Sequence, residues 1–184
     1  MTPFPLARSD FGTKILITIF LLSMIAAFVV AELNVYDKVG RIKDGVVLRY
    51  GPEAPPPNLD QAANIDPANL PSENDIVVAR MNTFSLLLDI THPHIFEIPL
   101  IIFVIAHFLM RTRVSEKFKI ANYLLSFTGV ILFIGSPWAV RYISIKTASM
   151  LYMGAILMGL TVLVMIVVSL WDMWQPIERR SPKT

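Results

Sequence analysis

The chain has 184 residues, of which 54% are hydrophobic and only 16% charged, and its mean hydropathy is +0.59. A soluble domain carries about 25% charged residues, so this composition excludes an ordinary water-soluble fold. The formal net charge of +2 comes from basic residues that flank the hydrophobic blocks, a pattern typical of membrane topology rather than of nucleic-acid binding.

The first hydrophobic block covers residues 15–31 (ILITIFLLSMIAAFVVA) and follows a short segment with Arg8 and Lys14. A secretory signal peptide shows the same order of features, but its apolar region is usually about 7–15 residues long. The greater length of this block favours a permanent membrane anchor.

Three further blocks of similar length follow, at residues 90–110, 120–138 and 147–171. Each is close to the ~20 residues that a helix needs to cross a ~30 Å hydrocarbon core. We therefore predict an all-α integral membrane protein with about four transmembrane helices and a mostly irregular outer loop between the first two. The expected parts are an N-terminus and first helix (1–31), a periplasmic loop with an interfacial helix (32–89), a three-helix membrane domain (90–174) and a cytoplasmic tail (175–184).

The outer loop carries turn-forming residues and shows no core of its own. Residues 41–50 read as a hairpin-like piece around an Asp-Gly turn, and the three prolines at 55–57 favour polyproline II. Ser72, with Asp75 three residues later, has the spacing of a capping box. A loosely amphipathic helix over 76–88 is then expected to lie along the outer interface and lead into the second span.

Four spans place both termini on one side of the membrane, and Lys and Arg indicate which side. The favoured orientation has both termini in the cytoplasm of a bacterial cell and loop 32–89 in the periplasm. It places these basic residues inside: Arg8, Lys14, Arg111, Arg113, Lys117, Lys119, Arg179, Arg180 and Lys183. On the opposite side Asp and Glu are mixed among the basic residues of the loop.

Two further patterns concern packing rather than chemistry. Ala155 and Gly159 on the fourth span form a small-xxx-small pair, with Gly154 beside it, which favours close approach of another helix. Tryptophans and tyrosines fall mostly at the ends of the blocks, where they are expected to anchor the helices at the interface: Trp138, Tyr142, Tyr152, Trp171 and Trp174.

Residues able to do chemistry gather on the second span. All three histidines, His92, His94 and His107, lie on it or at its outer mouth, where Asp89 and Glu97 add two carboxylates. Ionisable groups are costly inside a bilayer, so these residues are functional candidates. The alternative is a polar cap, in which the outer two histidines face water at the headgroups and His107 reaches the cytoplasmic surface.

Helical geometry separates the histidines. At 100° per residue His92 and His94 project about 200° apart, whereas His92 and His107 project about 60° apart and lie some 22 Å apart along the axis. Two histidines on one face fit the stacked two-haem pattern of b-type cytochromes. Because the cysteine count is zero, covalent c-type haem and thiolate metal sites are excluded on this chain.

Each haem would need a second axial ligand, and no other span carries a histidine. The ligand would come from another subunit or from a methionine of the fourth span: Met150, Met153, Met158 or Met165. Arg141 and Lys146, in the loop between the third and fourth spans, could hold the haem propionates at the outer surface.

A copper or zinc site is a separate possibility, because histidines and carboxylates both bind such metals. Its ligands would come from one cluster: Asp89, His92, His94, Glu97 and His107. A pair formed by His94 and Glu97, one turn apart, fits equally well a quinol site that accepts protons or a salt link to Arg141.

Several segments together carry a family resemblance: LLDITHPH at 87–94, His107, the basic turn before the third span, GSPWAVRY at 135–142 and WDMW at 171–174. Over about residues 40–174 the chain resembles a group of largely uncharacterised bacterial inner-membrane proteins with an N-terminal anchor, an outer loop and three further helices carrying a Thr-His-x-His motif. The resemblance implies an association with bacteria rich in respiratory cytochromes, and it supports His92, His94, His107 and Arg141 as positions of interest.

We therefore expect an accessory or haem-b-carrying subunit of a larger bacterial inner-membrane redox complex, not catalytic by itself, with His92 or His94 and His107 as axial ligands. The alternatives are a purely structural subunit without a cofactor, which the lack of a complete active-site set favours, and a copper- or zinc-binding membrane protein. The expected partners are the lipid bilayer, other subunits or further copies of the chain, and quinone, but not nucleic acid.

Overall fold

The computed structural model describes residues 6–40, 43–52 and 84–176. Within these ranges four helices are long and apolar enough to cross a membrane, and no strand occurs. The long helices are α1 (Phe11–Val39), α5 (Phe84–Met110), α6 (Glu116–Tyr142) and α7 (Ser149–Trp174). The short elements are η1 (Leu6–Arg8), α2 (Lys43–Tyr50) and η3 (Ile145–Ala148). The predicted all-α, multi-pass membrane fold is confirmed.

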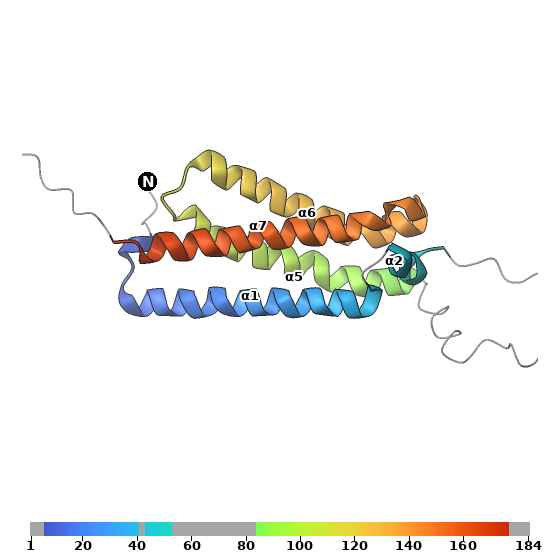
Figure 1. Cartoon of the computed structure of the whole chain (residues 1–184), viewed down its shortest axis with the longest axis horizontal. Helices are drawn as coiled ribbons and strands as arrows, with labels where there is room; N and C mark the ends of the chain where they lie inside the picture. Colours follow the sequence, from blue (N-terminus) through green and yellow to red (C-terminus); the bar gives the residue numbers. More distant parts are fainter. Residues whose placement is uncertain (1–5, 41–42, 53–83, 177–184) are drawn as a thin grey trace, which may run out of the picture.

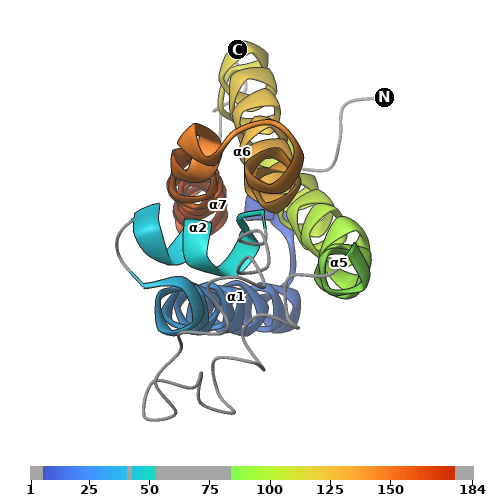
Figure 2. The ribbon, with the colours of Figure 1, turned by 90° about the vertical axis from the view of Figure 1, so that its right-hand side faces the viewer.

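The four long helices lie lengthwise beside one another (Figure 1). Viewed from one end, α1 and α6 occupy opposite corners of the bundle, with α5 and α7 at the other two (Figure 2). The end that faces the viewer in Figure 2 is called the loop end. It holds the end of α1, the start of α5, the end of α6, and α2, which lies across the bundle. The opposite end, where α1 starts and α7 finishes, is the terminal end.

The first span is longer than its hydrophobic block predicts. Asp10 caps the start of α1 by accepting hydrogen bonds from the amide and hydroxyl of Thr13, and the hydroxyl contact in particular lowers the pKa of Asp10. The helix continues past the predicted end at Ala31 to Val39, because the first residue that favours another backbone conformation is Gly40, whose φ is 74°.

The predicted hairpin at residues 41–50 is wrong, because Lys43–Tyr50 form α2. An isolated two-stranded hairpin has no face to bury, whereas α2 places apolar residues one turn apart against the bundle. Gly45 allows the contact, since a Cβ there would lie 1.8 Å from the carbonyl oxygen of Val39. The resulting cluster at the loop end consists of Val39, Val46, Tyr50, Leu87, Val140, Ala148 and Leu151. The interfacial helix expected before the second span lies mostly outside the described residues.

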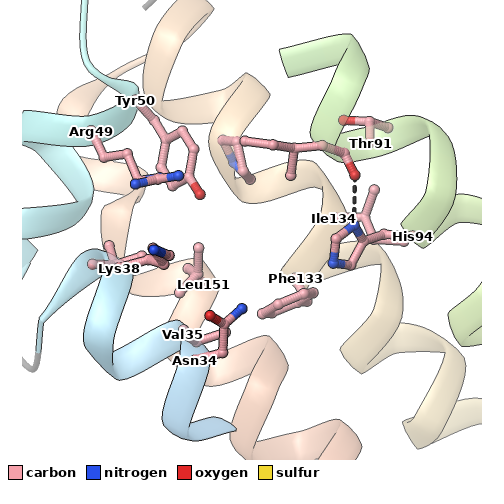
Figure 3. A pocket seen from close by; sticks show the side chains of 13 residues that line it. Asn34, Val35, Lys38, Arg49, Tyr50, Thr91, His94, Phe133, Ile134 and Leu151 are labelled. Carbon is pink, nitrogen blue, oxygen red and sulfur yellow. Dashed lines mark hydrogen bonds between the residues drawn. The ribbon is translucent and has the colours of Figure 1, made fainter. Parts of the chain in front are cut away.

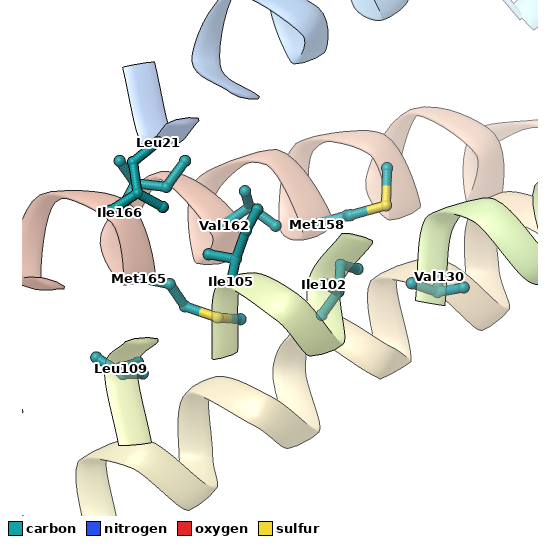
Figure 4. Close-up of a cluster of buried hydrophobic side chains, with 9 residues drawn as sticks. All are labelled: Leu21, Ile102, Ile105, Leu109, Val130, Met158, Val162, Met165 and Ile166. Carbon is teal, nitrogen blue, oxygen red and sulfur yellow. The ribbon is translucent and has the colours of Figure 1, made fainter. Parts of the chain in front are cut away.

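The main core lies between α5 and α7 (Figure 4). Its nine buried residues are Leu21, Ile102, Ile105, Leu109, Val130, Met158, Val162, Met165 and Ile166. The first span contributes only Leu21 to this set. Of its most apolar window 11% is buried, against 44% for the fourth span. The first helix is therefore loosely attached, which leaves room for grooves along its sides.

The α6 and α7 backbones approach each other closely around Gly154. A Cβ on Gly154 would lie 2.4 Å from the backbone nitrogen of Phe133, and one on Gly129 would lie 2.8 Å from that of Met158. By contrast, a Cβ on Gly159 would meet nothing within 4 Å. The sequence prediction of close approach on this span is right, but the glycine that permits it is Gly154.

At the terminal end a buried charge joins the α5–α6 turn to α7. Asp172, whose side chain is 8% exposed, accepts a hydrogen bond from Arg113 Nε at 2.8 Å and one from the Arg113 amide at 3.3 Å. Arg113 Nη2 also donates to the Asp172 carbonyl at 3.3 Å. This fork pairs a carboxylate that would otherwise be costly to bury.

Replacing Gly154 by alanine should destabilise the bundle, because the added methyl group overlaps the α6 backbone. We expect a loss of roughly 1–3 kcal/mol, the usual cost of overpacking, measured as a lower thermal unfolding midpoint in detergent by far-UV circular dichroism. Gly159→Ala is the matched control and should leave the midpoint unchanged or slightly higher. Equal midpoints for the two variants would show that this backbone contact does not limit stability.

Candidate functional site

His92 and His107 share the outward face of α5. Both are exposed, and the His92 ring contacts the ring of Phe96 edge-on at 5.7 Å. Phe96 and Phe103, which lie between the two histidines in the sequence, are 67% and 63% exposed. The predicted pairing of His92 with His107 on one face is therefore consistent with the burial pattern of the helix.

His94 lies on the other side of α5 and turns into the bundle. Its half-buried ring packs against that of Phe133 on α6 at 6.4 Å, and its Nδ1 lies 2.5 Å from the carbonyl oxygen of Ile90. A carbonyl oxygen only accepts, so Nδ1 carries the proton of this hydrogen bond. In the neutral ring Nε2 then keeps its lone pair and can accept a hydrogen bond or bind a metal.

Two cavities meet at His94 on the loop half of the bundle. The upper cavity, of about 200 Å³, lies at the loop end, where Lys38 and Arg49 form one wall and Thr91 and His94 another (Figure 3). The lower cavity, of about 240 Å³, lies between α1 and α5. The residues common to both are Asn34, Val35, His94 and Phe133, so the two cavities adjoin each other at these side chains.

The lower cavity brings together two carboxylates from different spans. Glu97 of α5 and Glu32 of α1 both line it, together with His94. Glu32 therefore joins the predicted pair of His94 and Glu97 as a third titratable residue. Glu32 was expected in the outer loop, because the first helix was expected to end at Ala31. Met158, one of the four candidate methionine ligands, lines the same cavity.

The predicted metal cluster is not assembled in the described residues. No three His, Asp or Glu side chains within 6–40, 43–52 and 84–176 are placed so that they could hold one metal ion. The histidines of the His-x-His pair have different surroundings, since His92 contacts Phe96 whereas His94 contacts Phe133. Asp89 is exposed on α5.

Arg141 has a structural contact at the loop end. Its Nη1 donates to the carbonyl oxygen of Gly51 at 2.8 Å and so holds the end of α2 against α6. Lys146 is exposed on η3. The role of either residue at a haem propionate stays a prediction.

Sequence reasoning missed the two cations of the upper cavity. Arg49 was expected in a hairpin and Lys38 in an irregular loop, so neither was placed beside the second span. The helical spacing of Val46 and Tyr50 was the available signal, because it gives α2 an apolar face that docks onto the bundle and carries Arg49 with it.

A hydrogen bond between α5 and α6 fixes the wall of the upper cavity. Trp138 Nε1 donates to Thr91 Oγ1 at 2.8 Å, and Thr91 is three residues before His94. Thr91→Val removes the acceptor while keeping the shape of the side chain, and it should cost roughly 0.5–1.5 kcal/mol of stability. Thr91→Ser keeps the oxygen and serves as the control in the same thermal unfolding assay. If valine and serine have equal effects, the hydrogen bond does not fasten the two helices.

Comparison with known proteins assigns the family. A family model described as a transmembrane helical domain, Aq_1264_TM, matches residues 72–181. No curated protein and no solved structure matches the chain. The match confirms the expected kinship with a multi-helix membrane family, while the Thr-His-x-His motif as a feature of that family stays a prediction. The match spans more than half of the sequence, and the chain therefore belongs to the Aq_1264_TM family of transmembrane helical domains.

Proposed function

We propose that the chain is an accessory subunit of a larger electron-transfer complex in the bacterial inner membrane, and that the outward face of α5 carries haem b where a partner subunit docks. The observation that carries the proposal is the exposure of both His92 and His107 on that face. An imidazole facing hydrocarbon loses its hydrogen bonds to water, so such residues are retained where a ligand or another chain uses them.

The spacing of the two histidines supports two haem positions rather than one. Fifteen residues of helix separate them by about 22 Å along the axis, most of the hydrocarbon thickness. Each would supply one axial ligand, and the partner would supply the other, since the described part of the chain offers no further histidine beyond the inward-turned His94. The exposed rings of Phe96 and Phe103 would pack against the macrocycles.

A purely structural subunit is the second candidate. The polar contacts that fasten the bundle, such as Arg113 with Asp172 and Trp138 with Thr91, form between residues of the chain itself and involve no cofactor. In this case the exposed face of α5 would pack directly against a partner helix. The copper or zinc alternative is weaker, because His92 and His94 lie on different faces and the described residues assemble no metal cluster.

The haem proposal is tested on the complex purified from its native membrane. We expect a reduced-minus-oxidised spectrum typical of haem b and extractable protohaem, and loss of at least half of that haem in His92→Ala and in His107→Ala, because each removes one axial ligand. Leu124→Ala, at an equally exposed apolar position on α6, is the control and should retain the haem.

Two results would contradict this assignment in different ways. A complex without protohaem excludes haem b altogether. A complex whose haem content is unchanged in both histidine variants places the haem in the partner and favours the structural role for this chain.

The proposed orientation can be tested directly because the chain has no cysteine. Pro52→Cys, at the loop end, should react with a membrane-impermeant maleimide applied to spheroplasts, whereas Arg8→Cys, at the terminal end, should react only after the membrane is opened. Both positions are exposed, so accessibility does not differ for reasons of packing. The reverse labelling pattern would overturn the inside placement of the termini.

A further inference from the structure

The upper cavity is lined by two cations from separate elements and by one imidazole. Lys38 of α1, Arg49 of α2 and His94 of α5 line it, and none of its lining residues is acidic. Among the described residues, the ion pair that Lys38 forms is a loose, exposed contact of 3.8 Å with Asp37. Figure 3 shows the Lys38 and Arg49 side chains together on one side of the cavity.

Arg49 is incompletely satisfied. Its Nε is buried and has no hydrogen-bond partner among the described residues. Its guanidinium carbon lies 5.7 Å from the centre of the Tyr50 ring, which supports the charge but accepts no conventional hydrogen bond. A buried donor on a charged group is costly when unpaired. The guanidinium fork matches the oxygens of a phosphate, so a phosphate in this cavity would supply the missing acceptor.

The lower cavity adds a second requirement for the ligand, because the wall of this cavity is largely apolar. Met24 and Ala27 of α1 line it together with Ile98 and Ile101 of α5. A free phosphate would leave this cavity without a matching occupant. An amphiphile with an anionic head and a hydrocarbon tail fits both cavities at once.

The charges also fix which way such an amphiphile points. Glu32 and Glu97 line the lower cavity, so an anion placed there would be repelled, whereas the upper cavity carries only basic and neutral groups. The anionic head must therefore lie at the loop end, at the level of the headgroups, and the tail must run toward the membrane centre. This is the orientation of a lipid in the leaflet at the loop end.

We propose that the two adjoining cavities together bind an anionic phospholipid, with its phosphate on Arg49 and Lys38 and an acyl chain in the lower cavity between α1 and α5. The lipid would connect α1 to the rest of the bundle, where few side chains of α1 are buried. Basic pockets between transmembrane helices are an established way to recognise such headgroups. This inference is independent of the haem proposal, because it uses a different face of α5.

The test measures the thermal unfolding midpoint of the purified full-length chain in neutral detergent micelles. Dioleoylphosphatidylglycerol added to the micelles should raise the midpoint, and dioleoylphosphatidylcholine should not. The double variant Arg49→Gln with Lys38→Gln should need about tenfold more phosphatidylglycerol for the same rise. The control, Lys146→Gln with Lys117→Gln, removes two exposed lysines and should respond like the unaltered chain.

Every other result overturns the proposal. Equal stabilisation by inorganic phosphate means an anion site without a lipid, and equal loss of response in the control means non-specific attraction to the micelle surface. Stabilisation by a short-chain ubiquinone but not by phosphatidylglycerol means that the groove is a quinone site. No rise with phosphatidylglycerol means that the groove binds no anionic lipid.

A second variant keeps the test decisive if the double variant fails to fold. Ala27→Phe fills the lower cavity without touching the cations. It should abolish the rise with phosphatidylglycerol and reduce the phosphatidylglycerol that copurifies from native membranes at least fivefold, as measured by mass spectrometry of extracted lipids. An unchanged amount of bound lipid in this variant would rule out an acyl chain between α1 and α5.

Discussion

The close approach of α6 and α7 at Gly129 and Gly154 is the constraint on which the rest of the bundle depends. Inside a bilayer, lipid tails are as apolar as leucine, so helices associate through van der Waals contact and hydrogen bonds rather than through the hydrophobic effect. Two glycines facing each other let the backbones touch, and the buried hydroxyls of Ser126 and Thr161 add a hydrogen bond of 2.7 Å across the same interface. The third span is then held firmly enough to present Trp138 to α5 and Arg141 to α2.

From this pair outward, the packing becomes progressively looser. The second span packs its inner face into the core with α7 and is fixed at the loop end by the hydrogen bond from Trp138 to Thr91. The first span contributes one residue to the buried core and makes its most specific polar contact at the terminal end, where Trp174 Nε1 donates to Thr18 Oγ1 at 3.2 Å. The grooves beside α1 therefore exist because the tight helix contacts lie between α6 and α7 and not along α1.

Hydropathy alone predicted the four spans, because a membrane helix needs an uninterrupted apolar stretch. Helical periodicity alone predicted that His92 and His94 lie on different faces of the second span. Neither signal could locate the end of α1, since helix continuation from Glu32 to Val39 depends on backbone hydrogen bonding and not on apolarity. The fold of residues 43–50 was equally hidden, because an Asp-Gly pair suits a hairpin turn as well as a tightly packed glycine in a helix. Arg49 and Lys38 joined the candidate site only through those two departures, so their meeting with His94 is a property of tertiary structure.

The two faces of α5 impose different chemistry on residues of one type. The outward histidines have no hydrogen-bond or ion-pair partner among the residues that the structure describes. The inward His94 has its Nδ1 engaged by its own helix and stands between a cationic cavity above and a carboxylate-lined cavity below. A helix that faced only lipid and core would need neither arrangement. Both proposals start from this asymmetry: the proposed partner subunit would use the outer face of α5, and the proposed lipid its inner one.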